Sequence, residues 1–326
     1  MKITRSGWLV LVCGLLVVAP TWADFNKRID VSTWLTEHSD LGFKKSEVAA
    51  FLAQTKAKPS IIPIIRNAPE RKWVWSQYGK RMVSDSRIKR GQQFVVENSA
   101  QLDRVAQATG VDGAIIAAIA GIESNYGANM GQHLTLRVLA TLAFDYPRRR
   151  AFFQRQLAEF FRLCYSQGLD PTKVKGSSAG AVGMGQFIPT SYRDFAVDGD
   201  GDQRIDLFHS KADNIASIAN YLSRHRWQAG APWLLAVNAD AVKPQWVSAK
   251  ANNKGVALKE WQQRGVLVSN AATQWPQEKF NLYAFTTAGE DEYLLGGANF
   301  YAITRYNHSL WYSRAVMDIA QAIATP

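Results

Sequence analysis

The chain has 326 residues, of which 47% are hydrophobic, 11% aromatic and 20% charged. This length and apolar content allow a sizeable core, which excludes a disordered tail, a collagen and a small disulfide-stapled domain. A total of 38 Lys and Arg against 27 Asp and Glu gives a net charge of +11. That balance indicates an anionic partner. It does not distinguish between nucleic acid, an acidic membrane and a carboxylate-bearing polysaccharide.

The first 23 residues have the composition of an export signal. Lys2 and Arg5 precede an apolar run from Trp8 to Ala19, and Thr21–Ala23 supplies a small-x-small cleavage site. The run is about 12 residues long, whereas a transmembrane helix needs about 20. We therefore expect cleavage after Ala23, with an uncleaved anchor as the alternative. Removing the two cations lowers the net charge from +11 to +9.

The two cysteines differ in their relation to this signal. Cys13 lies inside the apolar run and follows Val12, whereas a lipid-modified cysteine usually follows a small residue, so lipid attachment is not expected. Without the signal, Cys164 is the single thiol, and an internal disulfide is excluded. Its neighbours in F-F-R-L-C-Y predict a buried helical position.

Apolar spacing predicts a mainly helical chain. Helical periodicity covers about 31–57, is lost over 58–96, where three prolines occur, and resumes over about 97–109. Further helices are expected at 112–124, 134–144, 147–167, 210–226 and 309–323. Between 230 and 295 short strand-like runs take over, such as Leu234–Val237 and Leu282–Thr287. The predicted fold class is mainly α (α+β), with a small β-containing part late in the chain.

A glutamate ends the apolar helix predicted from Asp112 to Ser124. Asp112 suits the N-cap, and Glu123 shares one helix face with Ile115 and Ile119. If this face is buried, loss of water disfavours the charged carboxylate, which suits a general acid. A glutamate at a helix end can equally turn outward to water, and spacing alone favours that interpretation. The N-Y-G sequence that follows breaks the helix, which suggests the edge of a cleft.

Residues 176–192 form a glycine-rich segment, G-S-S-A-G-A-V-G-M-G-Q-F-I-P-T-S-Y. Its glycines let the backbone approach a ligand closely, and Ser177, Gln186 and Tyr192 add polar and aromatic groups. The segment lacks the Gly-Lys-Ser/Thr of a phosphate loop and the G-x-G-x-x-G of a dinucleotide site. A turn at a close helix–helix contact is an equal alternative.

Residues 198–206, D-G-D-G-D-Q-R-I-D, resemble an EF-hand calcium loop. Two features depart from that pattern, because Gln203 replaces the turn glycine and His209 stands where a bidentate glutamate is usual. Asp213 would then close a longer loop. The predicted ligands are Asp198, Asp200, Asp202, the carbonyl of Arg204, and Asp213. A solvated acidic turn without metal remains the alternative.

Taken together, these segments resemble the lytic murein transglycosylase B family, over most of the chain that follows the signal. The glutamate segment alone is a weak signal. The glycine-rich segment followed by the acidic loop and A-N-Y is specific. The similar segments are Trp75–Phe94, G-I-E-S-N-Y-G at 121–127, the glycine-rich segment, the acidic loop, Ile215–Leu222 and Phe300–Ser309.

The resemblance implies cleavage of the β-1,4 bond between N-acetylmuramic acid (MurNAc) and N-acetylglucosamine (GlcNAc) in peptidoglycan. The product would end in 1,6-anhydro-MurNAc, because the C6 hydroxyl of the same sugar replaces water as nucleophile. Glu123 matches the family's catalytic carboxylate and would act first as general acid and then as general base. Most glycosidases use two carboxylates; here one suffices, since the substrate's acetamido group would stabilise the oxocarbenium-like centre. No cofactor is required for this chemistry.

Carried across residue by residue, the resemblance implies further roles. Sugar-contacting residues would be Ser177, Gln186, Tyr221, Asn307 and Tyr312. The fold would be a lysozyme-like helical core with a flanking helical part and a small β subdomain, and a structural calcium ion would fit the acidic loop. The expected divisions are a signal peptide at 1–23, a helical part at 24–110, the catalytic core at 111–229, the β subdomain at 230–295, and a C-terminal segment returning to the core at 296–326.

The expected location is the bacterial periplasm, with peptidoglycan glycan strands as partner and no stable membrane anchor after signal cleavage. A charge of +9 would concentrate the enzyme on the carboxylates of that polymer. Nucleic acid is not expected as a partner, because the chain is exported and shows no recognised nucleic-acid motif. A hydrolytic, lysozyme-type muramidase and a non-catalytic peptidoglycan-binding protein remain the alternative functions.

Overall fold

A computed structural model of the chain describes residues 24–66, 73–268, 275, 277–287 and 289–325. The predicted signal peptide therefore lies outside the described residues. The fold is mainly helical, as predicted. Its helices are α1 (Ile29–Glu37), α2 (Lys45–Ala53), α3 (Ile61–Arg66), α4 (Trp75–Met82), α5 (Asp85–Glu97), α6 (Ser99–Thr109), α7 (Gly113–Ser124), α8 (Thr135–Asp145), α9 (Arg150–Ser166), α10 (Pro189–Phe195), α11 (Lys211–Arg224), α12 (Leu258–Gln263), α13 (Ala298–Tyr306) and α14 (Leu310–Ala324).

The strands form two antiparallel sheets. A small one pairs β1 (His133–Leu134) with β2 (Lys175–Gly176). The larger one has the order β3-β6-β5-β4, with β3 at Leu234–Ala236, β4 at Val256–Ala257, β5 at Lys279–Thr287 and β6 at Glu290–Gly296. This sheet and α12 enclose a separate apolar cluster of Leu235, Leu258, Trp261, Val266, Phe280, Leu282 and Leu295. The strand-like runs predicted between 230 and 295 are thus present.

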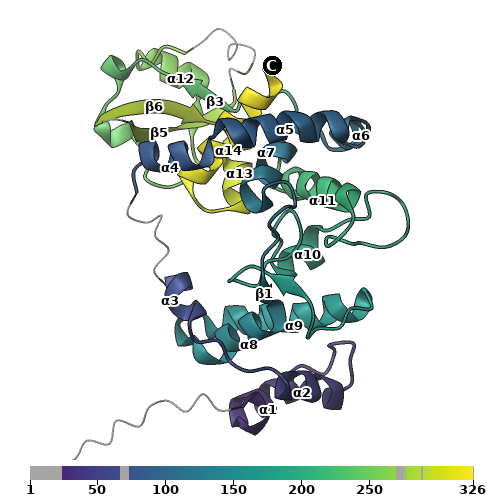
Figure 1. Ribbon diagram of the computed structural model, residues 1–326. Coiled ribbons are helices and arrows are strands. Elements are labelled where there is room, and N and C mark those ends of the chain that lie inside the picture. Colours follow the sequence, from purple (N-terminus) through teal and green to yellow (C-terminus); the bar gives the residue numbers. More distant parts are fainter. Residues whose placement is uncertain (1–23, 67–72, 269–274, 276, 288, 326) are drawn as a thin grey trace, which may run out of the picture.

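The C-terminal helix of the chain lies against the helix that carries Glu123. The C-terminal helix α14 packs against α4, α5 and α7, so the last helix of the chain lies beside elements from its first half (Figure 1). The larger sheet lies at the same end of the molecule, where β5 contacts α4. At the other end, α1 and α2 lie beyond α8 and α9, and α10 lies between the two ends.

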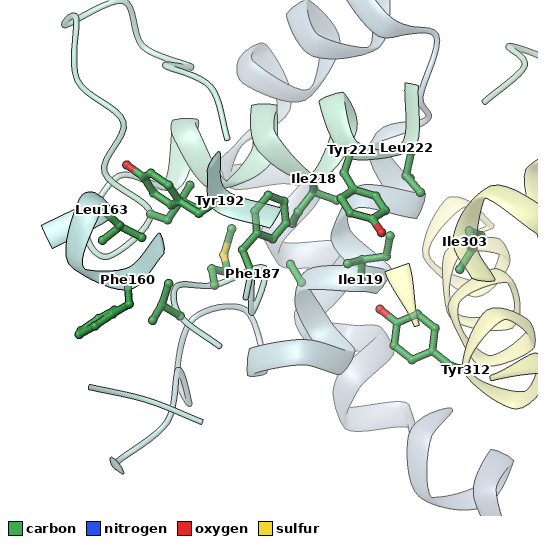
Figure 2. Packing of buried hydrophobic residues seen from close by; sticks show 14 of the residues in the cluster. Ile119, Phe160, Leu163, Phe187, Tyr192, Ile218, Tyr221, Leu222, Ile303 and Tyr312 are labelled. Atoms are coloured by element: carbon green, nitrogen blue, oxygen red, sulfur yellow. The ribbon is translucent and has the colours of Figure 1, made fainter. Parts of the chain in front are cut away.

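Helix α7 runs through the interior. Every residue from Ile115 to Gly121 is buried, and Ile119 lies near Phe187, Ile218 and Tyr221 in the packed core (Figure 2). Burial of this kind contributes about 1.5–3 kcal/mol for each large apolar side chain. Among the described residues no single helix is long and apolar enough to cross a membrane, although α6 and α7, bent by 113°, meet those criteria as a pair.

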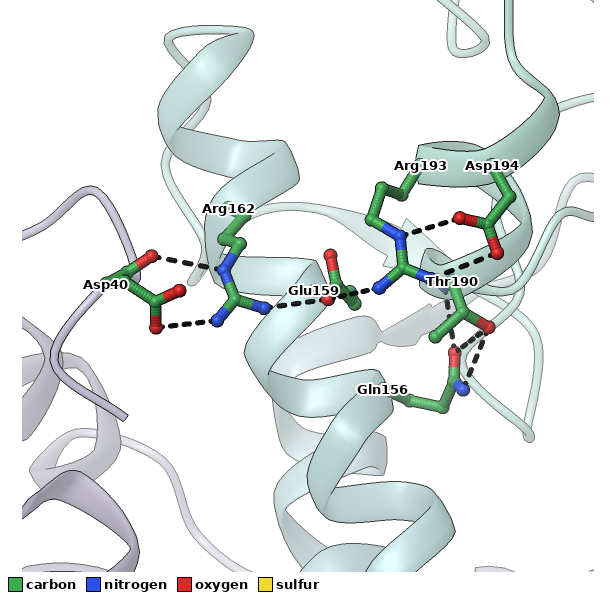
Figure 3. A network of polar contacts seen from close by, with 7 residues as sticks. All are labelled: Asp40, Gln156, Glu159, Arg162, Thr190, Arg193 and Asp194. Atoms are coloured by element: carbon green, nitrogen blue, oxygen red, sulfur yellow. Dashed lines mark hydrogen bonds and ion pairs between the residues drawn. The ribbon is translucent and has the colours of Figure 1, made fainter. Parts of the chain in front are cut away.

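A polar network on α9 fixes two other parts of the chain (Figure 3). Arg162 donates to the carboxylate of Asp40 before α2 and to Glu159, each at 2.7 Å, and Arg193 of α10 donates to Glu159, also at 2.7 Å. Gln156 accepts from the backbone N–H of Thr190 at 3.0 Å. Because α10 begins at Pro189, within the glycine-rich segment, these contacts hold the end of that segment in place.

Several predicted element boundaries are wrong. The region 58–96 is not irregular, because it contains α3, α4 and α5. Pro63 lies in the first turn of α3, where its missing N–H costs no helical hydrogen bond. The helical region predicted at about 31–57 contains two helices, α1 and α2, separated by a turn at Gly42, which has φ 85°. Helices α10, α12 and α13 were also not predicted. The division into domains stays a prediction.

Candidate active site

Glu123 lies in the last turn of α7 and is half-buried. The helix starts after Asp112, which occupies the N-cap position as predicted but makes no side-chain cap bond. It ends because Asn125 and Tyr126 adopt left-handed conformations with φ 54° and 61°. The Tyr312 hydroxyl donates a hydrogen bond of 2.7 Å to Oε1 of Glu123. The carboxyl group is therefore held by the protein rather than turned wholly outward to water.

Tyr312 is a buried donor to this carboxyl group. It lies in the first turn of α14, with its N–H 3.3 Å from the capping Oγ of Ser309, and its side chain is 2% exposed. Burial raises the pKa of Tyr312 well above the ordinary value of 10, and the nearby charge of Glu123 raises it further. The phenol consequently stays protonated at neutral pH and keeps donating to Glu123.

The turn that follows Glu123 is supported by α5. The guanidinium of Arg87 donates from Nε to the carbonyl of Gly121 at 3.1 Å, and the Tyr126 hydroxyl donates to the carbonyl of Arg87 at 2.8 Å. Burial raises the pKa of Tyr126 to about 12. The sequence did not single out Arg87, because it lies in the region predicted to be irregular. The helical spacing of Arg87, Gly91 and Phe94 is the signal that could have placed it.

The first part of the glycine-rich segment is a tightly packed turn. Ser177 folds back on it, because its Oγ accepts from the N–H groups of Ala179 and Ala181 at 3.2 and 3.0 Å. Gly180 has φ 81°, and a Cβ there would lie 2.4 Å from a methyl group of Leu139. Close packing therefore accounts for this glycine, in line with the alternative interpretation of the segment.

Gln186 takes a left-handed conformation with φ 51°. Its side-chain amide nitrogen donates to the carbonyls of Met130 and Gly183 at 3.1 and 2.9 Å. These two bonds fix the amide between the glycine-rich segment and the loop after α7. The amide carbonyl oxygen is the part of this side chain that remains to accept hydrogen bonds from a ligand.

Tyr221 and Tyr306 form a buried aromatic wall beside this segment. Their ring centroids are 4.7 Å apart. Tyr221 is 8% exposed and its hydroxyl donates to the carbonyl of Arg305 at 2.5 Å, while the Tyr306 hydroxyl donates to the carbonyl of Gly185 at 2.5 Å. Tyr221 thus supports the site from behind. Tyr306 was not among the predicted site residues, although it lies in the segment Phe300–Ser309 that resembles the family.

Two cavities are lined by residues that lie close to Glu123 or Tyr312 in the sequence. A cavity of about 550 Å³ is lined by Gly127, Met130 and Gly183, which include the turn after Glu123. A groove of about 900 Å³ is lined by Asn307 and Trp311, which include the turn before Tyr312. Asn307 is exposed at the C-terminal end of α13. The hydrogen bond from Tyr312 to Glu123 therefore links the segment that contributes to the first cavity with the segment that contributes to the second.

The acidic loop gathers three of the five predicted metal ligands. Oxygen atoms of Asp198, Asp200 and Asp202 lie within 4.8 Å of one another. The carboxylate of Asp198 accepts from two backbone N–H groups, those of Gly201 at 2.6 Å and Gln203 at 2.7 Å. Burial acts to raise the pKa of Asp198, but these backbone bonds outweigh it and lower the pKa. Such an oxygen-rich, negatively charged loop suits Ca²⁺.

The two departures from the EF-hand pattern are accommodated by the backbone and by other side chains. Gln203 has φ 71°, the conformation for which glycine is usual. His209 Nδ1 lies 2.9 Å from the carboxylate of Asp206. Asp213 is buried outside the group of three, and its oxygens accept from the N–H groups of Gly199 and Asp206 at 2.8 and 2.6 Å. Through these two hydrogen bonds, the carboxylate of Asp213 holds both ends of the loop in place.

The chain matches the family model described as transglycosylase SLT domain over residues 27–321. It is 33% identical over 300 residues to membrane-bound lytic murein transglycosylase B of Escherichia coli K12, covering 87% of this chain and 79% of that protein.

Solved structures agree with this match. Soluble lytic transglycosylase SltB1 of Pseudomonas aeruginosa superposes with a TM-score of 0.83 at 34% identity, over 90% of this chain and 98% of that one. The Escherichia coli lytic transglycosylase Slt35, solved in complex with calcium, gives 0.83 at 31% identity, over 93% and 95%. SltB3 of Pseudomonas aeruginosa, solved with NAG-NAM-pentapeptide, gives 0.80 at 30% identity, over 90% and 79%.

These matches confirm both the resemblance and the lysozyme-like fold expected from it. The likeness spans the half-buried glutamate, the glycine-rich segment and the acidic loop. The chain belongs to the lytic murein transglycosylase B family and is an enzyme that cleaves glycosidic bonds of peptidoglycan.

Proposed function

We propose that the enzyme cleaves the MurNAc-β-1,4-GlcNAc bond with Glu123 as its single acid–base group, and that it leaves 1,6-anhydro-MurNAc ends. Glu123 would protonate the glycosidic oxygen as the bond breaks. The resulting carboxylate would then take the proton of the C6 hydroxyl as that oxygen attacks C1 of the same sugar. One carboxyl group thus serves both steps, and no water is consumed.

The observation that carries this proposal is the hydrogen bond from Tyr312 to Glu123. A carboxyl group that must alternate between protonated and charged forms needs a fixed orientation and a donor that stabilises the charged form. The buried phenol supplies both, because it remains protonated next to the carboxylate. The partner of Glu123 is thus a phenol, whereas most glycosidases pair two carboxylates.

The predicted sugar-binding residues would contribute in two ways. Gln186 would accept hydrogen bonds through its carbonyl oxygen, since two backbone carbonyls hold its amide nitrogen. Asn307 would contact the strand in the groove that it lines. Ser177 and Tyr221 would instead shape the wall, because backbone groups already engage their hydroxyls. The complex of SltB3 with NAG-NAM-pentapeptide supports a glycan strand as the ligand.

We also propose that the acidic loop holds a structural Ca²⁺. Asp198, Asp200 and Asp202 would supply side-chain oxygens and Arg204 its carbonyl oxygen, with Asp213 closing the loop or fixing its ends. The calcium complex of Slt35 supports this assignment. The ion would take no part in the glycosidic chemistry, so its role would be to hold the segment between α10 and α11.

The expected place of action is the periplasm, where the substrate is. Export would follow from residues 1–23, and cleavage after Ala23 would leave the enzyme without a membrane anchor. Mass spectrometry of the protein recovered from the periplasmic fraction tests this directly. A mature chain that starts at Asp24 is expected, and a chain that retains the apolar run would contradict it.

Digestion of purified sacculi in heavy-oxygen water tests the reaction type. A hydrolytic muramidase incorporates one solvent oxygen at each new reducing end. The proposed reaction incorporates none, and each new end is lighter by one water because the C6 oxygen closes the ring. Labelled reducing ends as the main product would overturn the proposal in favour of the lysozyme-type alternative. Tight binding without any new ends would favour the non-catalytic one.

A further inference from the structure

A second, strongly basic pocket lies between the end of α11, the start of β5 and the start of α13. Its volume is about 520 Å³. Four cationic side chains line it, those of Arg224, Arg226, Lys279 and Arg305, and its one acidic lining residue is Glu278. We call this site the basic pocket. None of its residues was selected from the sequence, and the acid–base chemistry at Glu123 does not use them.

The cationic side chains of the basic pocket have no acidic partners in the part of the chain that the structure describes. The carboxylate of Glu278 accepts from the N–H of Ala298, another lining residue at the start of α13, at 2.9 Å, and is not paired with any of the four cations. The pocket thus concentrates positive charge that is available to an anion.

Two buried nitrogens beside the pocket have no hydrogen-bond partner within the described part of the chain. They are Nε of Arg305 and Nε2 of His225. The Arg305 guanidinium lies over the ring of Tyr301, 4.5 Å from its centroid, which fixes its plane. Burial lowers the pKa of His225, and the charges of Arg305 and Arg224 lower it further, as expected where cations converge. The unpaired Nε–H of Arg305 and the converging cations are what a bound carboxylate would relieve.

The backbone of one of these cationic residues, Arg226, is in a strained conformation. Arg226 follows the C-cap of α11 with φ 68°, where glycine is the usual residue. The N–H of Trp227 closes the turn on the carbonyl of Leu222 at 3.1 Å. Glycine would adopt this conformation without strain, whereas an arginine is not favoured at this position.

The basic pocket and the groove of about 900 Å³ share one lining residue. Arg305 lines both this pocket and the groove that Asn307 lines, and the loop of residues 247–253 contributes to both. Arg305 is also the residue whose carbonyl accepts from Tyr221. A polymer that occupies the groove therefore has an adjacent cationic site within the same wall of the molecule.

We propose that the basic pocket binds a carboxylate of the peptide moiety of peptidoglycan, and so holds the enzyme on the polymer outside the bond-cleaving site. This inference rests on the proposed function only for the choice of polymer. Two arginines that can each pair in a planar, bidentate manner favour a carboxylate ligand. The expected contribution is to affinity for peptide-bearing strands and not to the chemical step.

The test compares binding to sacculi in a Glu123→Gln background, which prevents digestion. Arg224→Gln with Arg226→Gln removes two exposed cations of the pocket. Lys45→Gln with Arg155→Gln removes two exposed cations from α2 and α9 and serves as the matched control. We expect about tenfold weaker binding for the pocket variant, as for the loss of a charged hydrogen bond. The control should bind like its parent, and all proteins should keep the same thermal midpoint.

Two further measurements, one of binding and one of turnover, identify the ligand. On sacculi whose carboxyl groups have been amidated, the pocket variant and its parent should bind equally. With the native glutamate restored, the pocket variant should turn over a short peptide-free glycan like wild type. Equal binding to untreated sacculi, an undiminished difference after amidation, or a loss of binding confined to phosphatidylglycerol vesicles would each overturn the proposal. If wild-type enzyme produces reducing ends, the proposed reaction fails while this binding comparison still stands.

Discussion

The hydroxyl of Tyr312 donates to the carboxyl group of Glu123 at 2.7 Å, although 189 residues separate them in the chain. This bond joins the helix that was recognised from its apolar pattern to the last helix of the protein. Because α14 packs on α7, the C-terminal segment completes the active site instead of merely covering it. The position of the carboxyl group therefore depends on the C-terminal helix.

Replacing Tyr312 by phenylalanine should lower turnover of sacculi by roughly ten- to 150-fold. The reason is the loss of a hydrogen bond to a charged group, which is worth about 1.5–3 kcal/mol. Binding to sacculi should change little, because the ring and its packing remain. Tyr165→Phe on the exposed side of α9 is the control and should retain full turnover. Unchanged turnover in Tyr312→Phe would show that the bond is structural only.

The support behind Glu123 predicts a steric effect at Gly121. A Cβ at this position would lie 2.5 Å from the Tyr126 hydroxyl oxygen, and that hydroxyl is held by the carbonyl of Arg87. Gly121→Ala should therefore destabilise the protein by about 1–3 kcal/mol, as overpacking does, and should lower turnover by displacing the turn after Glu123.

Urea unfolding and turnover of sacculi measure the two effects of Gly121→Ala. Gly113→Ala on the same helix is the comparison, since its nearest neighbour is 3.2 Å away. It should change both quantities much less. A Gly121→Ala protein with wild-type stability would mean that Tyr126 moves aside without cost.

The helix and the loop that carry the site residues were predicted better from the sequence than the contacts between distant segments. The buried helix ending at Glu123 followed from an unbroken apolar run, because burial of a whole helix leaves that signature. Cys164 is buried on α9, as predicted. The acidic loop followed from local spacing, since an EF-hand-like turn is built from neighbouring residues.

Contacts between distant segments could not be predicted in this way. Tyr306 reaches the carbonyl of Gly185 and Arg87 reaches that of Gly121, and neither pairing has a local signature. Helices α4 and α5 were missed because the three prolines before α4 led the whole region 58–96 to be interpreted as irregular. The buried pair Trp75 and Tyr78, three residues apart, was the local evidence for α4. The assignments of Ser177, Gln186, Tyr221, Asn307 and the metal ligands stay predictions.

Calcium removal should destabilise the protein. A ligand that binds only the folded state at one hundred times its dissociation constant adds about 2.7 kcal/mol, so a chelator should lower the thermal midpoint. Asp200→Asn with Asp202→Asn should abolish that shift, because two charged ligands are lost. An identical midpoint with and without chelator in wild type would contradict a structural ion.

A neighbouring substitution in the same loop should act in the opposite direction. Gln203 is left-handed, at a cost of about 1–2 kcal/mol for a residue with a Cβ. Gln203→Gly should therefore raise the free energy of unfolding by up to about 1 kcal/mol and keep the chelator shift. Loss of the shift in this variant would mean that the glutamine side chain itself helps to hold the ion.

Acid should weaken the attachment of the N-terminal segment. Burial acts to raise the pKa of Asp30, but the hydrogen bond and charge of Arg28 outweigh it and lower the pKa below 3.8. A lowered pKa stabilises the fold above about pH 3.8, and this contribution disappears as pH falls through the folded value. The effect should stay under about 1 kcal/mol, because the pair is partly exposed and screened.

The variant Asp30→Asn measures this contribution. It should be slightly less stable than wild type at pH 6, and the two should converge at pH 2 to 3. Urea unfolding at both pH values provides the comparison. In an Arg28→Gln background the same substitution should have a smaller pH-dependent effect, because the main partner that lowers the pKa of Asp30 is gone. A difference that persists at low pH would assign the effect to packing.

The role of Glu123 is tested most directly by the release of anhydro-MurNAc ends from intact sacculi by wild type and by Glu123→Gln. General acid–base catalysis contributes about 10²–10⁴-fold, and here one residue supplies both the acid and the base. We predict that Glu123→Gln loses at least about a thousandfold in this rate while it still binds sacculi and keeps the wild-type thermal midpoint. Release of the same anhydro ends at the wild-type rate would contradict the assignment of Glu123.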